Sequence, residues 1–358
     1  MLKTAADRNY RSLFNRIGAA LLMFYLIFNS LSVGITTAQE LIAMVFPSDL
    51  IDTVMSLGYY ASYLFAFMFP VLFFKLISRK HPFPDMKLEF KLNKNLWLVI
   101  PAALGINFLM AEINYLILTP INFEDIISPA IPNTYYAHNF VLDTLGTGIV
   151  PAFCEEFLFR GLILSALLPY GKKTAIFGSA VLFALMHQNP GQLIYTFVLG
   201  IILGYMVTES GSIWGGILLH FVNNFVSVVM SAAVYVLPEK IGEIVYYVIF
   251  SGIMGVGLTI SVVLIILHSV RRVKNKESEM RDIKMPRRAS AYELGLFESN
   301  ELPEARNEAI DYKLSRGYAA KGFFAPFNLV FIILAVINMM SLIAMAILNN
   351  LGVFDGIL

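Results

Sequence analysis

The chain has 358 residues, of which 58% are hydrophobic and only 14% are charged, and its formal net charge is +1. Soluble domains carry about a quarter charged residues, so this composition excludes an ordinary soluble protein and indicates an integral membrane protein. We expect membrane lipids, and no nucleic acid, among its partners. The single cysteine, Cys154, excludes an internal disulfide and a cysteine-based metal cage.

Apolar runs long enough to cross about 30 Å of hydrocarbon recur along the chain. Backbone polar groups have no water to bond inside a bilayer, and these runs lack the alternation of barrel strands, so helices are expected. The predicted fold class is all-α: a polytopic transmembrane helical bundle of eight to nine spans, with nine favoured. The nine expected spans are residues 17–37, 54–77, 96–118, 140 or 147–168, 174–187, 193–207, 213–236, 244–268 and 327–348.

The charges of the loops predict the orientation, because cytoplasmic loops carry an excess of Lys and Arg. Basic residues precede the first span and follow the second, fourth and eighth, whereas loops 39–53 and 119–139 hold acidic residues and no Lys or Arg. The N-terminus is therefore expected in the cytoplasm, with the first span retained as an anchor, and residues 349–358 outside. The expected localisation is an integral, multi-pass membrane protein, in the cell membrane if the source is bacterial.

The stretch PAFCEEFLFRG in the fourth expected span places Glu155, Glu156 and Arg160 within an apolar tract. A charge at the centre of a transmembrane helix costs about 2.5 to 3.5 kcal/mol on insertion scales, so such residues indicate a function. Glu156 and Arg160 are four residues apart and can pair on one helix face. Glu155 points about 100° away and can act separately as a base. Alternatively, the three residues form one neutralised cluster that joins helices.

Two later stretches add polar groups to the fifth and seventh spans. FALMHQNPG places His187 at the end of a short apolar run, and GILLHFVNNF places His220 and Asn224 on one helix face. Taken alone, each stretch has an ordinary interpretation, as an interfacial histidine or a hydrogen bond between helices. Together with a carboxylate, they supply what peptide hydrolysis requires: a base for water, donors for the oxyanion and an acid for the leaving nitrogen.

In this order, EEFLFR, FALMH and HFVNN resemble EExxxR, FxxxH and HxxxN, the three motifs of the CPBP intramembrane proteases. That family includes the type II CAAX prenyl endopeptidases and bacterial bacteriocin-processing or self-immunity proteins. The resemblance covers roughly residues 140–236 and implies a helical core with a water-accessible cavity. It also implies that Glu155 is the water-activating base, and that the site is completed by His187, His220 and Asn224. The residues with implied structural or substrate-orienting roles are Glu156 and Arg160.

Two mechanisms remain open for these residues. Zinc needs about three His or acidic ligands and an open position for water, which Glu155, His187 and His220 could supply. The motifs lack the HExxH arrangement, however, and Asn224 is a poor zinc ligand but a good oxyanion donor. We therefore favour a metal-independent glutamate mechanism without a cofactor, with zinc as the alternative.

The resemblance divides the chain into four expected parts. Residues 1–139 form the first three transmembrane helices, 140–268 the catalytic core with the eighth helix, 269–322 a cytoplasmic polar loop, and 323–358 the last transmembrane helix. The expected function is an intramembrane endopeptidase that cleaves membrane-associated peptides or proteins with an apolar or lipidated segment. The alternatives are an ion- or proton-coupled transporter, for which we find none of the expected inverted halves, and a non-catalytic membrane scaffold or immunity protein.

Overall fold

The computed structural model describes residues 5–43, 48–79, 83–92, 94–121, 137–284 and 326–350. Among these residues there is no β-strand and most are helical, which confirms the predicted all-α fold class. The long helices are α1 (Ala5–Ala43), α2 (Ser48–Ile77), α3 (Leu96–Leu118), α8 (Lys172–Met186), α9 (Leu193–Ser210), α10 (Trp214–Val236), α11 (Glu239–Lys284) and α13 (Pro326–Asn350). Single 3-10 turns, η1 (Thr119–Ile121) and η5 (Pro190–Gln192), follow α3 and precede α9.

One continuous helical run before α8 carries the first motif. Its segments are α5 (Ala137–Asp143), the π-helical η2 (Thr144–Ile149), α6 (Val150–Glu156), the π-helical η3 (Phe157–Leu164), α7 (Ser165–Leu167) and the 3-10 turn η4 (Leu168–Tyr170). Short π-helical segments inside α-helices are frequently found at functional sites. Here they flank α6 on both sides, and the last two residues of α6 are Glu155 and Glu156.

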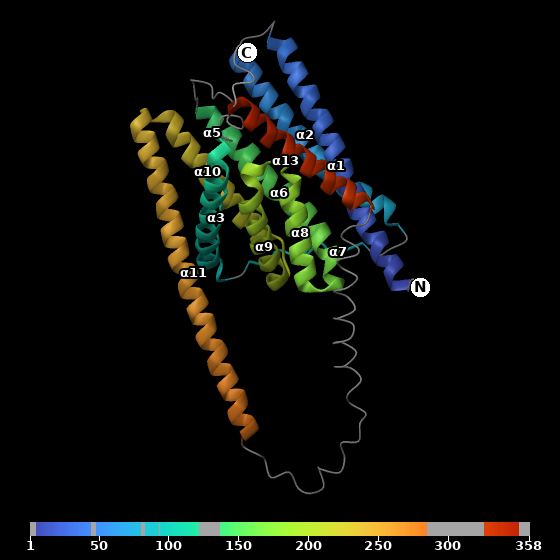
Figure 1. Ribbon diagram of the computed structural model, residues 1–358, viewed down its shortest axis with the longest axis vertical. Helices are drawn as coiled ribbons and strands as arrows, with labels where there is room; N and C mark the ends of the chain where they lie inside the picture. Colours follow the sequence, from blue (N-terminus) through green and yellow to red (C-terminus); the bar gives the residue numbers. More distant parts are fainter. Residues whose placement is uncertain are drawn as a thin grey trace.

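The helices form a bundle in which successive long helices run in opposite directions (Figure 1). Glycines make two of the tight connections, because Gly171 has a φ of 114° and Gly211 a φ of 69°, values that residues with a Cβ rarely adopt. In the bundle, α11 packs along α3, α8 along α9, and α1 between α2 and α13. The helical run that carries the first motif contacts α2, α8, α9 and α10.

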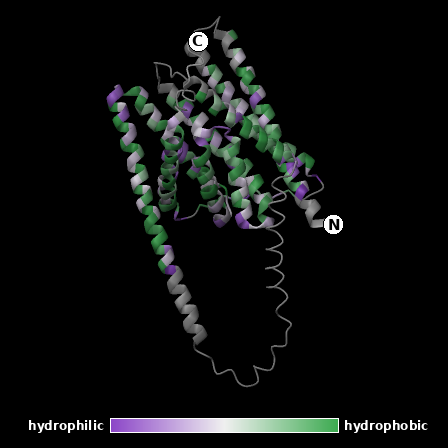
Figure 2. Cartoon of the chain, in the orientation of Figure 1, coloured by the Kyte–Doolittle hydropathy of each residue, from purple (hydrophilic) through white to green (hydrophobic). Residues whose placement is uncertain are grey.

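Seven of the described helices are long and apolar enough to cross a membrane. Hydrophobic residues make up most of the length of these helices, while hydrophilic residues gather towards helix ends and connections (Figure 2). The other two expected spans correspond to the helical run 137–170, which is divided into shorter segments, and to α8, which has 15 residues. The chain is thus an integral, multi-pass membrane protein.

The helices extend beyond several of the expected spans. The first helix, α1, begins at Ala5 rather than at residue 17, and α11 continues to Lys284. Residues 269–284, expected to start the polar loop, therefore belong to α11. The rest of that loop, from residue 285 to 322, lies outside the described residues. Charged residues favour a helix as readily as apolar ones, so hydropathy locates the span but not the helix end.

Two clusters of buried apolar side chains hold the helical run in place. The first joins α1 and α2 to η3 and α8, and includes Phe14, Phe67 and Phe183. The second lies among α3, α9 and α10, and includes Leu104 and Leu203. Between them, α6 contacts both α2 and α10. The end of α6 thus faces side chains from two separate parts of the chain.

Two glycines let α3 and α11 approach to backbone contact. A Cβ on Gly257 would lie 2.6 Å from the backbone of Gly105 and would overlap the carbonyl oxygen of Pro101. At the same crossing, Ser261 Oγ donates a hydrogen bond of 3.1 Å to the Ala102 carbonyl. Small residues and hydroxyl groups are typical of helix crossings in membranes. This crossing fixes α3, which in turn contacts α9 and α10.

Candidate functional site

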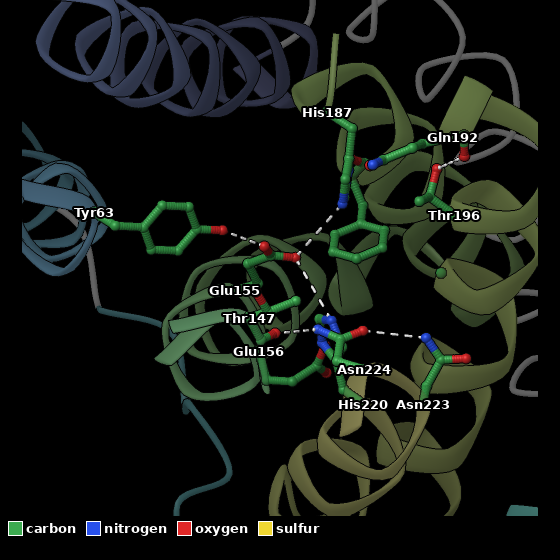
Figure 3. Close-up of polar contacts among 12 residues, drawn as sticks. Tyr63, Thr147, Glu155, Glu156, His187, Gln192, Thr196, His220, Asn223 and Asn224 are labelled. Carbon is green, nitrogen blue, oxygen red and sulfur yellow. Dashed lines mark hydrogen bonds and ion pairs between the residues drawn. The ribbon is translucent and has the colours of Figure 1, made fainter. Parts of the chain in front are cut away.

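Three separate helices bring predicted site residues around the carboxylate of Glu155 (Figure 3). Glu155 lies near the end of α6 and is 3% exposed. The Nε2 atom of His187, just after α8, and the Nε2 atom of His220, on α10, each lie 3.9 Å from Glu155 Oε2. Among the described residues, that oxygen has no hydrogen-bond partner. Two imidazoles therefore face one free carboxylate oxygen.

Glu156 turns away from its neighbour into an ion pair. Its Oε1 atom accepts a 2.7 Å hydrogen bond from Arg160 Nη1 and a 3.1 Å hydrogen bond from His220 Nδ1. Arg160 also donates to the Gly200 carbonyl at 3.3 Å, and its guanidinium lies 4.3 Å from the ring centroid of Phe183. Both charged side chains are fully buried, which is tolerable because they are paired and hydrogen-bonded. The ion pair therefore holds the imidazole of His220 through its Nδ1 atom.

The hydrogen bonds of the two histidines fix which ring nitrogen faces Glu155. His187 Nδ1 lies 2.8 Å from the carbonyl oxygen of Phe183, which can only accept, so this nitrogen carries the hydrogen. The Nδ1 atom of His220 is committed to Glu156 in the same way. In the neutral rings, both Nε2 atoms then present lone pairs towards Glu155, and they become donors only on protonation.

A chain of amides positions Asn224. Its Nδ2 donates a 2.9 Å hydrogen bond to the Thr147 carbonyl in η2, and its Oδ1 accepts a 3.1 Å hydrogen bond from Asn223 Nδ2. Asn223 Oδ1 in turn accepts a 2.8 Å hydrogen bond from Asn107 Nδ2 on α3. Asn223 and Asn107 are buried, and neither was predicted as a site residue. The only sequence signal was their occurrence as amides within otherwise apolar spans.

Tyr63 on α2 is a further site residue that the motifs did not predict. Its hydroxyl donates a short hydrogen bond to Glu155 Oε1, the oxygen that does not face the histidines (Figure 3). The ring of Tyr63 packs with Phe28 and Tyr59, at centroid distances of 5.7 Å and 6.4 Å. A tyrosine in an apolar, aromatic-rich span gives no signal in the sequence that separates it from packing residues.

The turn that carries His187 is held by the last helix. Gln188 has a φ of 52°, in the left-handed region that is unfavourable for a residue with a Cβ. Its side-chain Oε1 accepts a 2.5 Å hydrogen bond from Asn338 Nδ2 on α13. On the other side of the turn, Asn114 on α3 donates to the Pro190 carbonyl at 3.2 Å. Helices from distant parts of the chain thus fix the position of His187.

The site is more open on one side than on the other. The side chain of His187 is 18% exposed, whereas that of His220 is 4% exposed. Asn224 is half-buried, and Glu156 and Arg160 are fully buried. A ligand that reaches Glu155 would therefore pass His187 and Asn224, whereas the fully buried pair of Glu156 and Arg160 is closed to the outside.

Comparison with known proteins bears on the same segment. Residues 137–226 match the family described as type II CAAX prenyl endopeptidase Rce1-like. This segment, about a quarter of the chain, begins with α5, ends within α10 and contains all six predicted site residues. The match confirms the resemblance carried by the motifs, and it supports an intramembrane endopeptidase of the CAAX type. No curated protein and no solved structure matches the chain.

Proposed function

Because residues 137–226 match the Rce1-like endopeptidases, we propose that this membrane protein is a glutamic intramembrane endopeptidase, in which Glu155 activates water. The main support for this proposal is the position of Glu155 Oε2. This atom lacks a hydrogen-bond partner among the described residues and lies 3.9 Å from Nε2 of both His187 and His220. A water molecule held at about 2.8 Å from Glu155 Oε2 and from one Nε2 atom would bridge the 3.9 Å between them. This position is within the reach that general base catalysis requires.

The other side chains have distinct roles in the proposed reaction. Glu155 Oε2 takes a proton from water while the water oxygen attacks the peptide carbonyl carbon. The developing oxyanion accepts a hydrogen bond from the second hydrogen of Asn224 Nδ2, whose first hydrogen is held by a backbone carbonyl. As the carbon–nitrogen bond breaks, the proton taken up by Glu155 passes by way of Nε2 of His187, on the open side, to the leaving nitrogen, so that both side chains return to their starting states. His220, oriented by Glu156, holds the water.

The spacing of the site supports water rather than zinc. Zinc bonds of about 2.0 to 2.2 Å place neighbouring ligand atoms of a tetrahedral site about 3.4 Å apart. The distances of 3.9 Å between Glu155 Oε2 and the two Nε2 atoms are wider. Within the described part of the chain, no group of three or more His, Cys, Asp or Glu side chains is arranged to hold a metal ion. This wider spacing favours the metal-independent mechanism, and a chelator provides the direct test.

The surroundings of Tyr63 support an apolar or lipidated substrate. Aromatic side chains of α1 and α2 adjoin this residue, with Phe24 and Phe67 in contact at a centroid distance of 4.5 Å and Tyr59 38% exposed. These aromatic side chains make the surroundings of the carboxylate apolar, which suits a peptide that carries an apolar or lipidated segment. We propose that the substrate is a membrane-associated peptide or protein of this kind.

Cleavage by purified protein tests the proposed function. Full-length wild type, Glu155→Gln and Glu112→Gln are reconstituted in liposomes with a library of membrane-anchored peptides, with and without a strong chelator. Glu112 is a matched control, because it is a partly buried glutamate on α3 outside the site. We expect cleavage by wild type and Glu112→Gln, a loss of at least a hundredfold in Glu155→Gln, and no effect of the chelator.

Each contrary result has a defined meaning. Chelator sensitivity that zinc reverses would replace the glutamate mechanism with a metalloprotease. Equal cleavage by Glu155→Gln and wild type would exclude Glu155 as the base. If folded wild-type protein cleaves no peptide in any condition, the endopeptidase proposal is wrong, and transport or a scaffold role takes its place.

A further inference from the structure

A cavity of about 460 Å³ lies where the start of α1, the end of α2 and the turn η4 meet. It shares no residue with the Glu155 site. Its apolar walls include Phe74 from α2 and Leu168 from η4, and Phe74 is fully buried. Two cations, Arg16 from α1 and Lys87 from the loop after α2, also line it. An apolar cavity that contains two cations suits a ligand with an anionic group and an apolar part.

Neither cation is neutralised by an acidic side chain among the residues that the structure describes. Within the described part of the chain, Arg16 and Lys87 form no ion pair. Arg16 Nε donates to the Ser12 carbonyl at 3.3 Å, and its guanidinium lies 5.7 Å from the ring centroid of Phe74. Asp85 also lines the cavity and accepts a 3.1 Å hydrogen bond from the backbone N–H of Lys87. The cavity thus carries two positive charges and one negative charge.

The backbone around Lys87 is fixed before any ligand binds. Lys87 has a φ of 56°, a conformation that is costly for a residue with a Cβ and persists only where its surroundings enforce it. Its N–H is held by Asp85, and its carbonyl accepts a 3.1 Å hydrogen bond from the N–H of Ile213, next to the start of α10. The loop therefore presents the Lys87 side chain from a fixed point.

The position of the cavity indicates the source of its ligand. The candidate membrane span of α1 begins at Arg11 and that of α2 ends at Ile77, so Arg16 and the end of α2 lie close to a membrane surface. The loop charges predict that this surface is cytoplasmic. We propose that the cavity binds the phosphate of an acidic phospholipid, with Arg16 and Lys87 as its cations and Phe74 and Leu168 against the apolar part of the lipid.

Lipid retention by the full-length protein tests this proposal independently of cleavage. Wild type, the double variant Arg16→Gln/Lys87→Gln and the control Arg11→Gln are mixed in detergent with phosphatidylglycerol or phosphatidylcholine, and native mass spectrometry measures bound lipid. Arg11 is an exposed arginine on α1 outside the cavity. A cation near a membrane surface contributes about fivefold to binding an acidic lipid, so we expect the double variant to lose phosphatidylglycerol about 25-fold. Phosphatidylcholine binding should not change.

Further arms distinguish a bound lipid from misfolding, from general surface attraction and from soluble phosphate. The charge-preserving variant Arg16→Lys/Lys87→Arg should retain phosphatidylglycerol, which separates loss of charge from misfolding. Equal losses in Arg11→Gln and in the double variant would reduce the effect to general surface attraction and overturn the proposal. The proposal would also be overturned if the double variant bound as much phosphatidylglycerol as wild type. If inorganic phosphate raises the thermal unfolding temperature of wild type but phosphatidylglycerol does not bind, the site takes soluble phosphate and the lipid assignment is wrong.

Discussion

The two oxygens of Glu155 have different surroundings. Oε1 accepts the hydroxyl hydrogen of Tyr63, while Oε2 faces His187 and His220 without a hydrogen-bond partner among the described residues. A carboxylate with one oxygen held and the other free has a defined rotamer, which is the positioning that a general base needs. Tyr63 thus acts on the proposed reaction through Glu155.

Removing the Tyr63 hydroxyl should therefore slow the chemical step. Hydrogen bonds to charged groups contribute about 1.5 to 3 kcal/mol, so we expect Tyr63→Phe to lower kcat at least tenfold with little change in KM. Steady-state cleavage of one membrane-anchored peptide measures both constants. Tyr59→Phe, one helical turn earlier on α2, should retain wild-type kcat, and an equal loss in both variants would contradict a specific role for Tyr63.

The hydrogen-bonded amides of Asn107, Asn223 and Asn224 predict that substitutions of Asn107 and Asn224 have coupled effects on kcat. Asn107→Leu removes the donor that holds Asn223, so Asn224 loses its orientation and kcat should fall about tenfold. In an Asn224→Ala background, the same change should have almost no further effect on kcat, because residues that act as a unit are not additive. A double-mutant cycle on cleavage rates measures the coupling. Equal factors in both backgrounds would show that Asn107 does not act through Asn224.

At this scale, the sequence predicted the residues that occur in motifs. The pairing of Glu156 with Arg160 at four-residue spacing was predicted correctly, and Glu155 bonds to Tyr63 rather than to Arg160. The proximity of His187 and His220 to Glu155 agrees with the motif resemblance, although the catalytic roles stay predictions. Tyr63 and Asn107 were missed, because their partners lie 92 and 116 residues away and nothing in their neighbouring sequence indicates the contact.

Among the elements, the crossing of α3 and α11 depends on glycine. A Cβ on Gly257 would meet backbone atoms that cannot move without separating the helices, and overpacking of this kind costs about 1 to 3 kcal/mol. We expect Gly257→Ala to lower the thermal unfolding temperature by several degrees in detergent. Gly252→Ala on the same helix has open space at its Cβ and should leave the temperature unchanged or slightly higher. Equal temperatures for the two variants would contradict the close approach.

Hydropathy predicted the positions of the long helices but not their interruptions. The π-helical segments η2 and η3 flank α6, and nothing in the apolar sequence of that run distinguishes them from regular helix. The role of the last helix was also unassigned from the sequence. Its Asn338 holds the Gln188 turn next to His187, a contact across 150 residues that local patterns cannot reveal.

For the molecule as a whole, alternating loop charges predict a cytoplasmic N-terminus, and labelling can test that orientation. Lys91 and Glu239 are exposed. The loop after α2, which contains Lys91, and the start of α11, which contains Glu239, lie at opposite ends of the bundle (Figure 1). In a Cys154→Ala background, an impermeant maleimide should label Lys91→Cys only from the cytoplasmic side and Glu239→Cys only from outside. Labelling of both variants from one side, or the reverse pattern, would contradict the orientation.

The segment that matches known endopeptidases does not by itself contain the whole arrangement. Tyr63, Asn107 and Asn338 come from α2, α3 and α13, outside residues 137–226, yet each contacts the motif residues or their immediate neighbours. An excised or transplanted segment would keep every motif residue. It would lose the Tyr63 hydroxyl and the side-chain amides of Asn107 and Asn338, which hold the motif residues or their neighbours. The proposed activity therefore depends on the flanking helices as well as on the motifs, and a hybrid protein would need both.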